Sequence, residues 1–292
     1  MPTRVWRSGA PAAVLSMSTA CLPMYSLEAA MRLAAEADFA AVELAMCPEV
    51  WLRGTAPVRR SAERYGLKIA TVHQSLYSTS PTGGGARRMI DAARGAVELG
   101  APAVVIHAPG AKRWEDAGAQ RWLRALDSAQ QVIAGSGTRL ALENPGARPK
   151  RGAADVLSRI DDLVACARRY DLDLTFDTCH AGTAGIDLLA TYEAMRERLV
   201  NVHFSDLRSL RLPWHLPLVD IVWAHHQLPG DGRLDLAPLV QRLAADGYPG
   251  SVTAEVSFMA LAFWSPRRAV VRLRRLTEFV RAHAATSVPG DG

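Results

Sequence analysis

The stretch AARGAVELGAPAVVIHAPG (residues 92–110) contains one complete helix-to-strand unit of the chain. Its first part, AARGAVELG, has apolar residues at helical spacing and ends on Gly100, a residue type that favours the left-handed backbone at a helix C-terminus. The apolar run Ala103–Ile106 follows, and it is too short for a buried helix. His107 comes directly after that run. The stretch therefore predicts a helix, a short buried strand and a polar residue at the end of the strand.

The same unit recurs along the whole chain. Helical spacing is also present in SLEAAMRLAAEA, where Ser26 is the expected N-cap, and in DVLSRIDDLVACARRY. Short apolar runs are predicted as eight strands: Ala13–Ser18, Ala41–Ala45, Ile69–Val72, Ala103–Ile106, Leu140–Leu142, Leu172–Phe176, Leu199–Phe204 and Val252–Val256. Regular alternation of strand and helix predicts parallel strands joined by crossover helices.

Eight such units most simply close into a (β/α)₈ TIM barrel of the α/β class. An open doubly wound sheet is the alternative architecture. Its dinucleotide-binding form is disfavoured because no Gly-rich phosphate motif opens the first helix. At 292 residues the chain fits one barrel domain over residues 1–292. A long connection, residues 207–233, interrupts the alternation after the seventh strand, and a loop of this length in a compact domain is usually functional.

Composition limits the classes of protein to which this chain can belong and the compartment in which we expect it. Hydrophobic residues make up 49% and charged residues 22%, as in ordinary globular proteins. No apolar run reaches the roughly 18–20 residues of a membrane span, and the N-terminus lacks the apolar core of a signal peptide. Four cysteines are scattered without a CxxC pair, which predicts reduced thiols. We therefore expect a cytoplasmic protein without a membrane partner.

The net charge of +5 comes mainly from arginines on predicted helices. Such clusters are usually solvated faces, and a surplus this small does not imply nucleic acid. A small-molecule substrate is the expected partner. The arginine-rich helices are compatible with a homo-oligomer, but no pattern fixes its size.

Polar residues of metal-ligand type lie at the ends of the predicted strands or in the segments that follow them, where the active site of a barrel lies. They are His73, His107, Glu143, Asp177, His180, His203, Asp206 and Glu255. Any one of them alone is compatible with a structural role, because a buried polar group needs only a hydrogen-bonding partner. Several carboxylates at one rim would repel one another unless a cation lies between them.

We therefore predict a divalent metal held by Glu143, Asp177, His203 and Glu255. Three carboxylates and one imidazole suit Mn²⁺, Mg²⁺ or Co²⁺. Zn²⁺ or Fe²⁺ becomes favoured if further histidines bind, and the candidates for this are His73, His107, His180 and His226.

The motifs SLEAAMRLAAEADFAAVEL, YGLKIATVH, LALENPG, FDTCHAGTAGID, VNVHFSD and GDGRLDLAPLVQRLAADGYPGSVTAE occur in this order along nearly the whole chain. In this order they resemble the xylose isomerase-like TIM barrel superfamily, which includes sugar epimerases, inosose-processing enzymes, dehydroshikimate dehydratases and endonuclease IV. The resemblance is specific to the superfamily and much less specific to one reaction.

The isomerase and epimerase branch implies a single metal and a small polyhydroxylated keto or sugar-like substrate. Glu143 and Glu255 would then be the proton donor and acceptor on either side of the carbon next to the carbonyl. His180 and Asp206 would orient substrate hydroxyls or support the site from behind. The other expected substrate contacts are His73, His107 and Trp214, the last in the long connection that would cap the substrate.

The endonuclease IV branch is the alternative and implies three zinc ions, nine ligands and cleavage at abasic sites in DNA. The chain retains most of the matching positions, including His226 before the GDG motif. It departs from the pattern at Ala224, where that family has an aspartate. This loss puts a full trinuclear site in doubt and leaves room for a two-metal site. A third reading, a barrel that binds without turnover, is disfavoured because both acid–base carboxylates are present.

Overall fold

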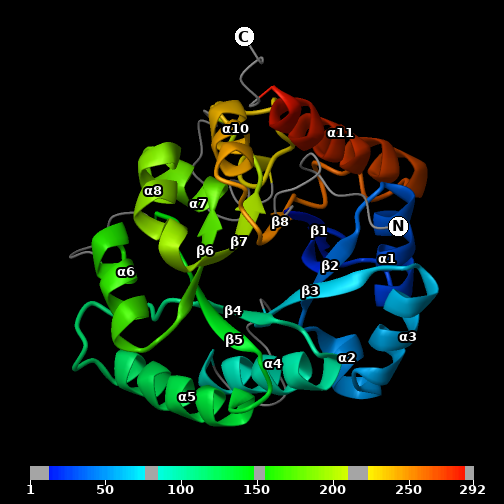
Figure 1. Ribbon diagram of the computed structural model, residues 1–292. Coiled ribbons are helices and arrows are strands. Elements are labelled where there is room, and N and C mark those ends of the chain that lie inside the picture. The colour runs from blue at the N-terminus through cyan, green and yellow to red at the C-terminus, as the bar shows by residue number, and fades with distance from the viewer. Residues whose placement is uncertain (1–12, 76–84, 148–154, 210–222, 287–292) are drawn as a thin grey trace.

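Eight parallel strands form a closed barrel in the computed structural model, which describes residues 13–75, 85–147, 155–209 and 223–286 (Figure 1). The strands are β1 (Val14–Ser18), β2 (Ala41–Ala45), β3 (Lys68–His73), β4 (Ala103–His107), β5 (Arg139–Glu143), β6 (Asp173–Asp177), β7 (Leu199–Phe204) and β8 (Ser251–Ala254). Each strand pairs with the next, and β8 pairs with β1. The predicted (β/α)₈ barrel is confirmed, and the open sheet is wrong.

Helices surround the barrel on its outside (Figure 1). They are α1 (Leu27–Glu36), α2 (Pro48–Arg53), α3 (Ala56–Arg64), α4 (Gly85–Leu99), α5 (Ala117–Ile133), α6 (Ile160–Arg169), α7 (Thr178–Ala184), α8 (Leu188–Met195), α10 (Ala237–Ala245) and α11 (Pro266–Ala285). Within the described ranges, none of these helices combines the length and the apolar character needed to cross a membrane.

Local sequence signals explain several helix ends. Ser26 caps α1, because its side chain accepts a hydrogen bond from the backbone N–H of Ala29 at 3.2 Å. Gly100 follows α4 with a φ of +68°, the left-handed conformation expected of a glycine after a helix. The helix predicted from Asp155 onward begins only at Ile160. Leu157 adopts a φ of 64° and interrupts the helical backbone, so the prediction was wrong over these first residues.

The barrel interior is polar, whereas the space between strands and helices is apolar. Large buried side chains of the outer core include Leu33, Met89 and Leu126. Inside the barrel, the side chain of Glu43 on β2 bonds to that of Asn201 on β7. Because β2 and β7 are not neighbours, this bond crosses the interior. Barrels are usually filled there by branched apolar residues, so a polar interior indicates a site built into the barrel.

Several strands run further than predicted, and this places the polar residues directly on the sheet. His73, His107, Glu143 and Asp177 are the last residues of β3 to β6. The ladder continues through them, with His107 opposite Glu143 and Asp177 opposite His203. Strand β8 instead ends at Ala254, so Glu255 lies one residue beyond the sheet.

Candidate metal centre

The predicted ligand set converges at the carboxyl ends of β5 to β8. Glu143, Asp177, His203 and Glu255 each offer one ligand atom, and these four atoms all lie within 4.8 Å of one another. Asp177 and His203 are fully buried, and Glu143 is nearly so. Adjacent parallel strands direct their ends to one rim, which explains how residues from four separate segments meet.

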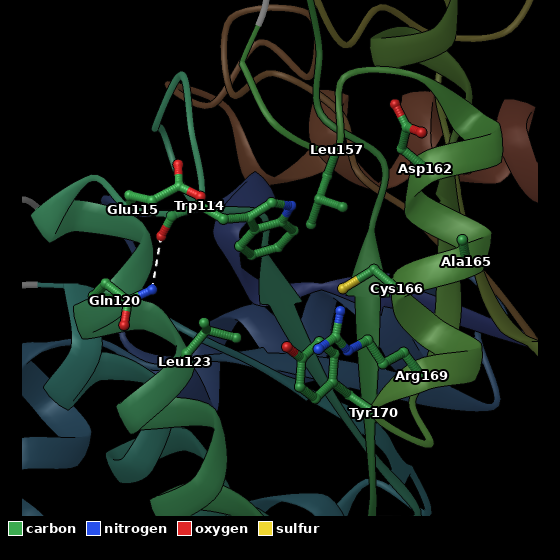
Figure 2. A pocket seen from close by; sticks show the side chains of 10 residues that line it. All are labelled: Trp114, Glu115, Gln120, Leu123, Leu157, Asp162, Ala165, Cys166, Arg169 and Tyr170. Atoms are coloured by element: carbon green, nitrogen blue, oxygen red, sulfur yellow. Dashed lines mark hydrogen bonds between the residues drawn. The ribbon is translucent and has the colours of Figure 1, made fainter.

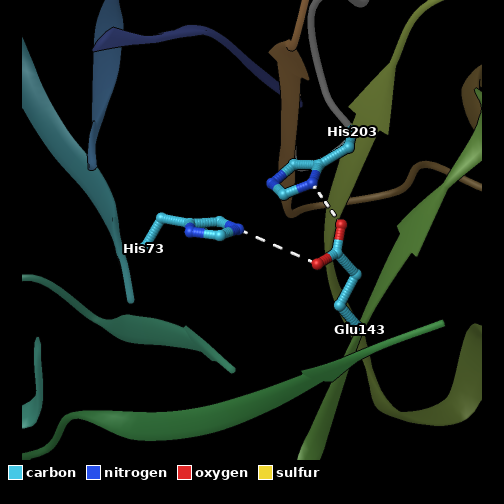
Figure 3. A group of neighbouring side chains, drawn as sticks. All are labelled: His73, Glu143 and His203. Carbon is cyan, nitrogen blue, oxygen red and sulfur yellow. Dashed lines mark hydrogen bonds and ion pairs between the residues drawn. The ribbon is translucent and has the colours of Figure 1, made fainter. Parts of the chain in front are cut away.

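His203 lies at the centre of this group. Its Nδ1 is 2.9 Å from Glu143 Oε1, 2.9 Å from Glu255 Oε2 and 3.8 Å from Asp177 Oδ2. Figure 3 shows the contact between His203 and Glu143, with His73 approaching the other oxygen of the same carboxylate. One nitrogen atom therefore faces three carboxylates.

Burial and mutual charge shift the pKa values of this group strongly. Burial raises the pKa of Asp177 to about 6, although the charges of His180 and His226 oppose the change. Burial also acts to raise the pKa of Glu143 and of Glu255. The positive charge of His203, together with hydrogen bonds and charges from the surrounding histidines, outweighs burial and holds both pKa values well below their usual range. For His203, burial is outweighed by the surrounding carboxylates, and its pKa lies well above the usual value.

Unsatisfied oxygens show that the group fits a cation. Asp177 Oδ2 and Glu255 Oε2 are buried and accept no hydrogen bond. The hydrogen bond from His203 Nδ1 goes to Glu143 Oε1, so it does not serve Glu255. Buried carboxylate oxygens without a partner are costly unless a cation neutralises them. The donor set of carboxylate oxygens and one imidazole therefore suits a divalent metal.

The other predicted histidines adjoin this centre on two sides. His107 Nε2 lies 3.1 Å from Glu143 Oε2, and His73 Nε2 lies 3.8 Å from the same oxygen. On the opposite side, His180 and His226 form a second potential ligand group with Asp177. A third group joins His73, Glu143 and His203. The three groups share residues and together make one continuous cluster; the roles of these histidines as ligands stay predictions.

One nitrogen of several of these histidines is held by a backbone carbonyl. His73 Nδ1 lies 2.6 Å from the oxygen of Gln74, and His180 Nδ1 lies 3.0 Å from that of Asn144. His226 Nδ1 lies 3.2 Å from the carbonyl oxygen of Glu255. Such contacts orient imidazole rings around metal ions.

Asp206 holds the beginning and the end of the long connection together. Its two carboxylate oxygens accept four backbone N–H groups, which belong to Leu207, Gly230, Gly232 and Leu234. A Cβ atom on Gly232 would lie 2.3 Å from Asp206 Oδ1, which explains the second glycine of GDG. Because four donors already occupy its oxygens, Asp206 supports the loop and has little capacity left for a substrate hydroxyl. Trp214, the other predicted contact in this connection, lies outside the described residues.

Glu43 is the residue of this region that the sequence did not single out. It is fully buried in the middle of β2, and its Oε2 lies 3.0 Å from His203 Nε2. The sequence feature that could have identified Glu43 is its position as a carboxylate at the centre of the apolar run AVELA. A barrel strand is covered by helices on one face and by the interior on the other, so a charged residue inside it requires a partner.

Cavity size does not mark the site. A cavity of about 660 Å³ lies between α5 and α6, outside the barrel (Figure 2). Trp114, Leu157 and Tyr170 line it together with charged groups at its edge. It contains no member of the carboxylate and histidine cluster. The chemistry of the rim, with its buried unpartnered oxygens, is the stronger indication of function.

The strands form a closed parallel barrel, and acidic residues and histidines gather at the carboxyl ends of these strands. These two features define the class of α/β barrels that could hold a metal at that end. The chain belongs to the xylose isomerase-like TIM barrel family, whose model matches residues 31–276.

The chain is similar to proteins that match nearly all of it or about one third of it. An uncharacterized protein of Mycobacterium tuberculosis is 28% identical over 294 residues, which span 94% of this chain and 98% of that protein. An inosose dehydratase of Lacticaseibacillus casei is 28% identical over 103 residues, or 34% of this chain and 35% of that protein. The solved structure of a D-tagatose 3-epimerase-like protein has a TM-score of 0.69 at 20% identity and covers 94% of this chain and 100% of its own. The last likeness concerns the fold.

Proposed function

We propose that the protein is a divalent-metal-dependent isomerase, epimerase or related lyase that acts on a small polyhydroxylated keto or sugar-like substrate. The observation that carries the proposal is the placement of two carboxylates around one imidazole. Glu143 Oε1 and Glu255 Oε2 each lie 2.9 Å from His203 Nδ1. Two acid–base groups therefore lie close together at one rim. Such a pair is needed when one group removes a proton from the substrate and the other returns a proton to the same or the neighbouring carbon.

In this proposal the two glutamates move the proton. One removes the proton from the carbon next to the substrate carbonyl, and the other returns a proton to the opposite face or to the neighbouring carbon. A divalent metal held by Glu143, Asp177, His203 and Glu255 would stabilise the negative charge that develops beside that carbon. Burial of the site excludes water and strengthens these electrostatic effects.

The exposed histidines are suited to contact substrate. The side chains of His107 and His180 are 36% and 26% exposed, whereas that of His73 is 1% exposed. His107 and His180 therefore reach the open side of the cluster, and we assign them to substrate hydroxyls. His73 lies behind them as a support for Glu143. Trp214 stays a proposed capping residue of the long connection.

The named relatives support a keto substrate. One is named as an inosose dehydratase and another as a D-tagatose 3-epimerase-like protein. Loss of a proton next to a carbonyl is a step common to dehydration and epimerisation of such compounds. The buried carboxylates of this chain are suited to that step.

Solvent exchange tests the proposal. The metal-supplemented protein is incubated in D₂O with a panel of ketoses and inosose, and deuterium at the carbon next to the carbonyl is followed by NMR. We expect exchange or conversion of at least one compound that depends on added metal. Absence of exchange across the panel, together with nicking of DNA, would contradict the proposal.

A second candidate is a multinuclear phosphodiester hydrolase of the endonuclease IV type. The observation that favours it is the presence of three overlapping ligand groups. Against it, Ala224 is buried and offers no side-chain oxygen at the position where that family has an aspartate. Metal content of two or three ions per chain and cleavage of an abasic oligonucleotide would support this candidate over the first.

A further inference from the structure

Glu43 is a buried carboxylate in the centre of the barrel. Its side chain is fully buried, and in the described part of the chain its only ion pair is with His203. Three donors converge on its Oε2: Thr71 Oγ1 at 2.8 Å, His203 Nε2 at 3.0 Å and Asn201 Nδ2 at 3.2 Å. A charge in this position needs an explanation, because an isolated buried carboxylate is strongly destabilising.

The contact with His203 determines which nitrogen of the ring carries hydrogen. An ionised carboxylate can only accept hydrogen bonds, so His203 Nε2 must be the donor in this contact. The other nitrogen, Nδ1, faces Glu143, Asp177 and Glu255 on the opposite side of the ring. With its hydrogen on Nε2, a neutral imidazole presents a free lone pair at Nδ1, toward those three carboxylates.

We propose that Glu43 is a positioning residue that fixes the ring orientation and tautomer of His203, so that Nδ1 is presented as the metal-binding nitrogen. This inference rests on the metal site of the proposed function. It adds a residue from β2, on the far side of the barrel, to a site whose other members come from β3 to β8 and the segments that follow them.

The surroundings hold Glu43 itself in one position. Asn201 donates to Glu43 Oε2, and its own side-chain oxygen accepts from Ser251 Oγ at 2.7 Å and Thr253 Oγ1 at 2.8 Å. Thr71 fixes the same carboxylate from β3. A chain of hydrogen bonds thus runs from β8 through β7 to β2 and ends at the ring of His203. A ligand held from behind in this way keeps its orientation whether or not a metal is bound.

Metal affinity tests the role of Glu43. Chelator competition on the Zn²⁺-loaded full chain should show affinity about tenfold weaker in Glu43→Gln and about 100-fold weaker in Glu43→Met, which lacks any acceptor. Ser16→Ala serves as the control and should bind Zn²⁺ like the wild type. It removes a fully buried hydroxyl that has no hydrogen-bond partner and does not touch the network around Glu43.

The outcomes separate this inference from the proposed function. If the wild type binds Zn²⁺ and both Glu43 variants retain it equally well, the positioning role is wrong while the metal site stands. A wild-type chain that binds no Zn²⁺ overturns both. A loss in Ser16→Ala as large as in Glu43→Met would show a general effect of core polarity and would also overturn the inference.

A measurement on the unmutated protein covers the case in which the Glu43 variants do not fold. Long-range ¹H–¹⁵N spectra of the Zn²⁺-loaded protein report the tautomer of each histidine, and His203 is assigned from the signal lost in His203→Gln. We expect hydrogen on Nε2 of His203. Hydrogen on Nδ1 would overturn the proposal.

Discussion

The charged side chains at the rim of the barrel and those on its outer surface are arranged in opposite ways. On the outer surface, Arg139 lies 2.8 Å from Asp173 and 3.2 Å from Asp171, and each of these three groups has an opposite charge beside it. At the rim, the ion pairs that the structure describes for Glu143, Asp177 and Glu255 are with histidines alone. Two of their buried oxygens have no hydrogen-bond partner. The outer pairs are complete without a ligand, whereas the proposed cation would supply the missing partner at the rim.

The largest expected effect is at the two proton-transfer residues of the rim. Glu143→Gln and Glu255→Gln should each lower turnover about 10²–10⁴-fold, because an amide cannot accept or return the proton. The measurement is the rate of exchange or conversion of the substrate identified in D₂O. Glu193→Gln, which changes an exposed carboxylate on α8, is the matched control and should keep wild-type turnover. Intact turnover in both rim variants would refute the proton-transfer assignment.

The next effect concerns the support of the rim by Asp206. Asp206→Ala leaves four backbone N–H groups of the returning loop without their acceptor, and we expect a loss of roughly 2–4 kcal/mol of unfolding free energy. Urea denaturation followed by circular dichroism measures it. Wild-type stability in this variant would show that water replaces the carboxylate without cost, and the loop would not depend on Asp206.

Metal binding at the rim should also be coupled to the release of protons, so that metal affinity depends on pH. In the metal-free protein the carboxylates around His203 raise its pKa well above the usual value and so favour the imidazolium form. Metal binding displaces a proton from that form, so apparent affinity, measured between roughly pH 6.5 and 8, should rise with pH by up to about tenfold per unit. Below about pH 6 the slope should steepen, because the pKa of Asp177 is raised to about 6 and its carboxyl then also takes up a proton.

Calorimetric titration with Mn²⁺ in buffers of different ionisation enthalpy counts the displaced protons. About one proton per metal is expected near pH 7.5. Affinity independent of pH over this range would indicate that His203 does not bind the metal.

The smallest effect is expected on the outer surface. Arg139→Ala removes pairs to Asp171 and Asp173, but the arginine side chain is 44% exposed and solvent screens these charges. We expect a loss of less than about 1 kcal/mol in unfolding free energy and unchanged metal affinity. A change in metal affinity would mean that the surface ion pairs and the rim are coupled, and the two regions would not be independent.

The sequence predicted the barrel because strand and helix alternate in nearly every segment. It predicted that Glu143, Asp177, His203 and Glu255 would meet at one rim, because carboxylates and histidines lie at the ends of the strands. The start of α6 could not be predicted, because Leu157 adopts a left-handed backbone. That conformation is usually indicated in a sequence by a glycine, and position 157 is a leucine. Glu43 was missed for another reason. Its partner His203 is 160 residues away in sequence, and only closure of the barrel brings β2 and β7 across from each other.

Metal content of the purified protein decides whether the rim binds a cation. After incubation with Mn²⁺ or Co²⁺ and removal of free metal, elemental analysis should find close to one divalent ion per chain, and a chelator should lower the unfolding temperature by several degrees. Binding at 100 times the dissociation constant corresponds to about 2.7 kcal/mol of stabilisation. A chain that takes up no metal and unfolds at the same temperature with and without chelator would contradict the account.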